Sequence, residues 1–203
     1  MRVPALVLFG GLTLAACDLS TPEKDRPNPG VEAAGVQAVA PAVPGPAPNQ
    51  ALIDATPQVS LTEAQRAEFR ALAKSYIDDA AKENTRGFSV VGNLEDEVVA
   101  LQPSQTHAWT VRLQRGQTYR VIGGCDNECT DMDLELLDPN GKIIERDTLP
   151  DSFPILNVSP SANGAYTVRF VMKTCTVQPC YAAARLYHQT GSTAEPAEDE
   201  QAA

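Results

Sequence analysis

The side chains best suited to chemistry are acidic, and they crowd one short stretch of the chain. Oxygen ligands of this kind, placed at loop and strand ends, suit Ca²⁺, although the spacing is not that of an EF-hand loop. We favour turn-forming residues on a solvated acidic face. The alternative is a calcium site, for which the candidate ligands are Asp126, Asp131, Asp133, Asp147 and Asp151.

Sequence signatures of catalysis are missing. The chain contains no G-x-S-x-G, H-E-x-x-H or P-loop motif. His107 and His188 stand at the ends of predicted strands, where surface positions are expected. The formal net charge of −10 argues against nucleic-acid binding, which needs clustered Lys and Arg. We therefore predict a non-enzymatic protein, with a hydrolase that uses the acidic cluster as a distant alternative.

The N-terminus carries an export signal. Arg2 is followed by an uncharged, mostly apolar run that is too short to span a bilayer. The segment ends in Leu14-Ala15-Ala16-Cys17, which resembles the lipobox of bacterial lipoproteins. The resemblance implies that residues 1–16 are a signal peptide and that Cys17 is lipidated and anchors the chain in the inner or outer membrane. We expect the rest of the chain to face the periplasm or the cell surface.

Four cysteines remain after the lipobox: Cys125, Cys129, Cys175 and Cys180. In an exported chain an even set indicates two disulfides, and three connectivities are possible. We favour Cys125–Cys129 and Cys175–Cys180, because the second pair would flank a short loop between two predicted strands. A zinc site made of the four thiolates is the alternative, which export disfavours.

The remaining chain divides by composition. Residues 17–59 hold half of the sixteen prolines and no aromatic residue after Cys17, so we predict a disordered tether. Residues 60–86 have apolar residues at helical spacing, with Ser60 and Glu63 as a candidate capping box. We expect this amphipathic helix to pack on the following domain; an interfacial membrane helix is the alternative. Residues 190–203 are predicted to be a disordered acidic tail.

Residues 87–189 alternate between apolar and polar side chains, which is typical of half-buried antiparallel strands. Turn residues such as Asn140-Gly141 and Asn163-Gly164 separate the strands. We predict a mainly β protein, an antiparallel, jelly-roll-like β-sandwich of about nine strands. The predicted strands are 88–91, 98–101, 108–113, 118–122, 132–137, 142–145, 155–158, 166–172 and 181–187.

Several runs within this region carry a second resemblance. The stretches WTVRLQRGQTYRV, CDNECTDMDLELLDPNGKIIERD, DSFPILNVSP, GAYTVRF and CTVQPC resemble, in order and spacing, bacterial pre-peptidase C-terminal domains. The resemblance covers about residues 98–188 and implies a small, non-catalytic β-sandwich with roles in substrate binding, secretion or stability.

Together these observations predict a membrane-anchored envelope lipoprotein whose β-sandwich binds an envelope protein or glycan. The alternative is a structural or calcium-stabilised surface module without a specific ligand. No cofactor other than calcium is expected.

Overall fold

The structure, a computed structural model, describes residues 45–190. The predicted signal peptide, Cys17, tether residues 17–44 and tail residues 191–203 lie outside the described residues. Nine strands and two helices make up the described part, so the prediction of a mainly β fold is confirmed. The elements are α1 (Gln50–Ala55), α2 (Glu63–Asn84), β1 (Phe88–Val90), β2 (Glu97–Leu101), β3 (Thr106–Leu113), β4 (Tyr119–Cys125), β5 (Cys129–Leu137), β6 (Ile143–Asp147), β7 (Ile155–Val158), β8 (Gly164–Cys175) and β9 (Cys180–Gln189).

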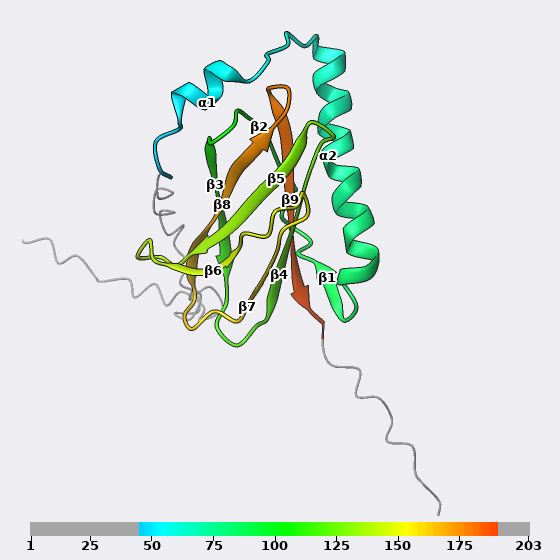
Figure 1. Cartoon of the computed structure of the whole chain (residues 1–203). Coiled ribbons are helices and arrows are strands. Elements are labelled where there is room, and N and C mark those ends of the chain that lie inside the picture. Colours follow the sequence, from blue (N-terminus) through cyan, green and yellow to red (C-terminus); the bar gives the residue numbers. More distant parts are fainter. Residues whose placement is uncertain (1–44, 191–203) are drawn as a thin grey trace, which may run out of the picture. The chain divides into compact units, whose positions relative to one another are not determined.

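The strands form two antiparallel sheets that pack face to face (Figure 1). One sheet has the order β1-β9-β4-β7, with β2 also paired to β9, and the other has the order β3-β8-β5-β6. Strands β2 to β9 thus run as β2-β9-β4-β7 against β3-β8-β5-β6. From β2 to β9, successive strands alternate between the sheets except for the β5–β6 hairpin, as in a two-sheet jelly roll. β8 and β9 lie inside their respective sheets and not at an edge.

The core between the sheets is built by the alternation that the sequence shows. Trp109, Val111 and Leu113 of β3 point inward and are buried, as predicted. The same holds for alternate residues of the other long strands, which meet in one apolar cluster: Tyr119, Val121, Met132, Leu134, Leu136, Tyr166, Val168 and Phe170. The alternation of apolar and polar side chains along paired strands therefore accounts for the register of the sandwich.

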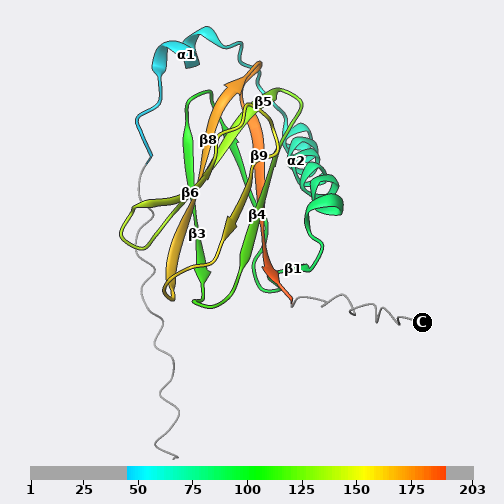
Figure 2. The same cartoon turned by 60° about the horizontal axis from the view of Figure 1, so that its bottom comes forward.

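Helix α2 covers the outer face of the five-stranded sheet (Figure 2). Ala73 and Ile77 are buried there against Ile122, Tyr181 and Ala183, so the predicted packing on the domain is confirmed. Close approach depends on Gly124 of β4, because an added Cβ would lie 3.3 Å from the backbone nitrogen of Ile77. No helix within residues 45–190 is long and apolar enough to cross a membrane.

The predicted cap of this helix is wrong by two residues. Thr62, not Ser60, is the N-cap, and its side chain and that of Gln65 form the capping box. Both T-x-x-Q and S-x-x-E fit the motif in sequence. The preceding chain decides between them, because the Val59 N–H donates to the carbonyl of Gln178 and holds the segment extended at that point.

The predicted tether is also wrong in its last part. Asn49 caps helix α1, Ile53 is buried, and the extended segment that follows forms a parallel bridge between Gln58 and Gln178. We call residues 49–59 the strap. The strap is ordered because the domain supplies hydrogen-bond partners that composition cannot show: Ser104 Oγ accepts from Asn49 N, and the Gln178 side chain donates to Ile53 O and Thr56 O.

Candidate functional site

The acidic residues that the sequence singles out lie mainly at one end of the sandwich, where β4 ends and β5 begins. They do not converge: residues 45–190 contain no group of three or more His, Cys, Asp or Glu side chains that could hold a metal ion. The predicted calcium ligands Asp126, Asp131, Asp133, Asp147 and Asp151 are thus not brought together by the fold.

Three of these carboxylates have clear structural roles. Asp147 accepts hydrogen bonds from Leu149 N and Ile155 N, at 3.1 and 2.8 Å, and so ties the β6–β7 connection to the start of β7. Asp151 accepts from Phe153 N at 2.9 Å. Asp133, on β5, lies 3.6 Å from the Lys173 ammonium group of β8. The contacts of Asp147 and Asp151 match the favoured interpretation, in which Asp side chains stabilise turns, whereas Asp133 is a buried strand residue.

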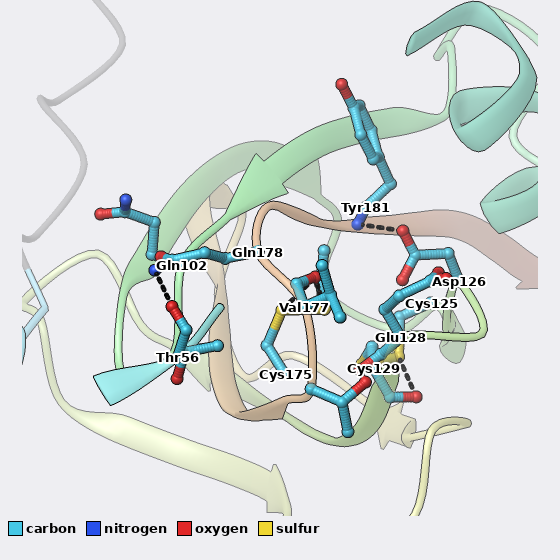
Figure 3. Close-up of a disulfide and its surroundings, with 12 residues drawn as sticks. Thr56, Gln102, Cys125, Asp126, Glu128, Cys129, Cys175, Val177, Gln178 and Tyr181 are labelled. Carbon is cyan, nitrogen blue, oxygen red and sulfur yellow. Dashed lines mark hydrogen bonds between the residues drawn. A yellow bond between two sulfur atoms is a disulfide. The ribbon is translucent and has the colours of Figure 1, made fainter. Parts of the chain in front are cut away.

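Asp126 and Asp133 are both buried, but Asp126 bonds a backbone N–H where Asp133 faces an ammonium group. Only 2% of its surface is exposed, and its Oδ2 accepts a hydrogen bond of 2.7 Å from Tyr181 N at the start of β9 (Figure 3). Burial raises the pKa of this carboxyl to about 6, against the opposing effect of the backbone hydrogen bonds. The nearby Glu128 carboxylate raises the pKa further. The sequence offers no sign that this Asp differs from its neighbours.

Both disulfides lie at the same end of the sandwich. Cys125–Cys129 and Cys175–Cys180, the pairs favoured from the sequence, are joined in the structure. This leaves none of the four thiolates free, so the alternative of a zinc site is wrong. The two disulfide loops are also bonded to each other, because the Glu128 carbonyl accepts from both the amide and the hydroxyl of Thr176.

An exposed apolar group stands beside these loops. Leu149 is 62% exposed and Phe153 is 39% exposed, both in the β6–β7 connection. The Phe153 ring packs edge-on against Tyr76 of α2, with 5.7 Å between ring centroids, and the Tyr76 hydroxyl donates to Asn127 Oδ1. We call this region, made of Tyr76, residues 126–131 and residues 148–154, the loop surface.

The loop surface is held to the sheets from two directions. Met132 N of β5 donates to Asp151 O, and Gly123 N of β4 donates to Pro154 O, so the β6–β7 connection is bonded to both sheets. On the helix side, Arg185 of β9 bonds Asp96 at 2.6 and 2.8 Å and Asp78 of α2 at 2.7 Å. These bonds fix the part of α2 that carries Tyr76.

Sequence reasoning missed Leu149 and Phe153. The sequence does contain a sign of their exposure. Each is a large apolar residue followed by proline, in Leu149-Pro150 and Phe153-Pro154, and neither belongs to an alternating strand pattern. The two histidines offer no rival site: His107 Nε2 lies 2.7 Å from Glu97 Oε1, and His188 pairs within the sheet opposite Ser89 and Tyr119.

Comparison with known proteins gives a distant structural neighbour. No family model matches the chain, and no curated protein sequence matches it. Among solved structures the chain resembles PliG of Aeromonas hydrophila, a periplasmic lysozyme inhibitor of g-type lysozyme. The sequence identity is 12% and the TM-score is 0.37, over 66% of this chain and 96% of that one. The resemblance to pre-peptidase C-terminal domains and to lipoproteins stays a prediction.

Proposed function

We propose that this protein is a lipid-anchored protein of the bacterial envelope, without catalytic activity, and that its loop surface binds another envelope protein. Anchoring rests on the lipobox that ends at Cys17. Export to an oxidising compartment is supported by the two disulfides, because such bonds form and persist outside the cytoplasm.

The observation that carries the binding proposal is the exposure of Leu149 and Phe153 on loops that are otherwise tightly held. Loops on a rigid scaffold are where binding residues concentrate. Here two disulfides and the bonds of Asp147 and Asp151 fix the backbone, while the apolar side chains face solvent. Fixed apolar side chains lose little conformational entropy on binding, which favours affinity.

A protein partner fits the loop surface better than a glycan. Its most exposed apolar side chain is the aliphatic Leu149, and its two aromatic rings meet at an interplanar angle of 74°. They therefore do not form a flat, parallel platform. Apolar anchors at the centre of a surface with a polar rim are typical of protein interfaces.

Site-specific photocrosslinking in intact cells tests the proposal. A photoreactive benzoylphenylalanine replaces Phe153 in the full-length anchored protein, and in a matched control it replaces Val90 of β1. The two positions are 39% and 43% exposed, so unspecific crosslinking is comparable. We expect one dominant protein adduct from position 153 only.

A second change gives the internal control. Leu149→Ser should abolish the adduct at position 153 while the free energy of unfolding stays within about 0.5 kcal/mol, because Leu149 is an exposed loop residue. The same adducts from positions 90 and 153, or no adduct at 153, would contradict a binding role. The protein would then fit the alternative of a structural surface module.

A further inference from the structure

The strap is held mainly by one residue of the domain, Gln178. The Gln178 side chain donates from Nε2 to Ile53 O and to Thr56 O, both at 2.8 Å, and Figure 3 shows the second of these bonds. The Gln178 main chain donates from N to Pro57 O at 2.8 Å and accepts from Val59 N at 3.0 Å. A single residue therefore makes four hydrogen bonds to the strap.

All four bonds go to main-chain atoms of the strap, and so does the bond between Asn49 N and Ser104 Oγ. Gln178 is 2% exposed and lies in the loop 175–180, which the second disulfide closes, so its position is fixed. We call this loop the clamp. Main-chain hydrogen bonds to an extended segment are a recurrent means by which proteins capture peptides. The clamp thus holds the strap in the way that it would hold a separate peptide.

The side chains of the strap contribute little to this contact. Among residues 49–59 Ile53 alone is buried, while Leu52 and Val59 are 40% and 44% exposed. Residues 53–58 and Gln178 line a cleft of about 490 Å³, so the strap is not close-packed on the clamp. The conformational entropy lost by ordering the strap opposes these few contacts. We therefore expect the strap to open at a lower free energy than the sheets do.

A short connection joins the strap to the rest of the domain. Val59 is followed by Ser60 and Leu61, and Thr62 is already the N-cap of α2. Ser60 is exposed and Leu61 is half-buried. Rotation at a few such residues moves one element relative to another, and a terminal segment beyond a hinge can be exchanged between copies of one chain.

We infer that the clamp is a peptide-binding site with an exchangeable occupant, and that the strap of a second copy of this chain can replace the chain's own strap. The second copy fits because it presents the same main-chain groups and the same Ile53 side chain. Reciprocal exchange links two domains through their straps and leaves both sheets unchanged. This inference does not rest on the proposed binding at the loop surface.

A fluorescein-labelled peptide of residues 49–59 tests the site by fluorescence anisotropy. Ile53→Ser in the purified full chain should release the chain's own strap and leave the clamp intact. We expect the peptide to bind this chain at least tenfold more tightly than the unmodified chain, in which the attached strap competes at high effective concentration. Leu52→Ser is the matched control and should leave the binding of the unmodified chain as it is, because Leu52 is exposed. An Ile53→Ser peptide should bind the opened chain at least tenfold more weakly.

A second way to open the strap keeps the test decisive. If the Ile53→Ser chain does not fold, Val59→Pro replaces it, because proline lacks the N–H that donates to Gln178 O and the sheets are not altered. Equal binding of the peptide to the opened and unmodified chains, or no binding to an opened chain that folds, would overturn the inference.

Exchange between copies is tested with two purified full-length chains that carry different affinity tags. Benzoylphenylalanine replaces Val59 in one of them, and Val90 in a matched control, since the two positions are 44% and 43% exposed. We expect adducts that join the two tags through residues 175–180, from position 59 only. Adducts confined to single chains would show that each strap stays on its own domain and would refute exchange. Adducts between chains from both positions in equal amounts would refute it as well, because they report unspecific contact.

Discussion

The two ends of the sandwich satisfy their polar groups in different ways. At the end that carries the β3–β4 and β5–β6 turns, Asp138 Oδ1 accepts from both Asn140 N and Lys142 N, and Asn163 Oδ1 accepts from Arg115 N. The Tyr166 hydroxyl donates to Ala162 O. At the disulfide end, by contrast, the buried oxygens Glu128 Oε2 and Asp131 Oδ1 accept no hydrogen bond, and Leu149, at 62%, is the most exposed large apolar side chain of the described residues.

We interpret this contrast as a division between a part of the fold built for stability and the part for which binding is proposed. The turn end is held by hydrogen bonds without a disulfide, both within its turns and between them. The disulfide end contains groups that destabilise it, and two covalent links oppose that tendency. Proteins often place unfavourable groups at sites of interaction and compensate for them elsewhere.

Of the changes that test this comparison, removing one disulfide should have the largest effect on stability. Cys175→Ser with Cys180→Ser should lower the free energy of unfolding by about 2 kcal/mol, the chain-entropy value for so short a loop. It should also speed hydrogen exchange at the Val59 amide, which bonds to Gln178 inside the loop. Urea unfolding and amide exchange measure the two effects.

The other disulfide provides the control. Cys125–Cys129 closes a loop of similar length, so Cys125→Ser with Cys129→Ser should cost a similar free energy but leave exchange at Val59 unchanged. Equal acceleration at Val59 in both variants would show that the strap responds to general destabilisation and not to its own loop.

Neutralising Asp126 should raise the free energy of unfolding. Since its folded pKa is raised to about 6, ionisation penalises the native state increasingly as pH rises through that value. Asp126→Asn should therefore stabilise the protein by up to about 2 kcal/mol at pH 7.5, with most of the gain lost by pH 4, where the carboxyl is protonated in the folded state and about half protonated in the unfolded state. Thermal unfolding of the two chains between pH 4 and 8 tests this, and a gain that did not depend on pH would contradict the assigned cause.

A glycine substitution probes the turn end with the smallest expected effect. Gly116, in the β3–β4 turn, has a φ of +82°, and nothing lies within 4 Å of an added Cβ. Gly116→Ala should therefore cost about 1 kcal/mol through backbone strain alone. Gly92→Ala is the matched control, because its surroundings are equally open and its φ is not positive. Similar unfolding midpoints for both would exclude strain at the turn.

Sequence alone predicted the strands well, because the longer strands of this fold show their period and are bounded by turn residues. β3 is an example, where Trp109, Val111 and Leu113 mark one face and Gly116 marks the turn that follows. The error at the start of α2 has the opposite origin. Two overlapping capping motifs are equivalent in sequence, and a bond to the distant Gln178 selects one of them.

The loop surface and the strap were beyond prediction for a related reason. Whether Asp126 is buried, or Leu149 exposed, depends on how loops from β4, β6 and β8 meet, and no local pattern records that. The strap has the composition of a disordered linker, yet Ile53 finds a buried site and Gln178 bonds two of its carbonyls. Long-range partners outweighed the local preference in each case.

The strap also determines how the domain would bear mechanical load. A pull on the chain before Gly45 meets its first hydrogen bond to the domain at Asn49, which bonds Ser104, and then the bonds between residues 53–59 and Gln178. Gln178 sits in the ring closed by Cys175–Cys180, so the force divides between β8 and β9. Each of these strands is flanked on both sides by others in its own sheet, and tension on the tether is therefore shared by the two sheets together.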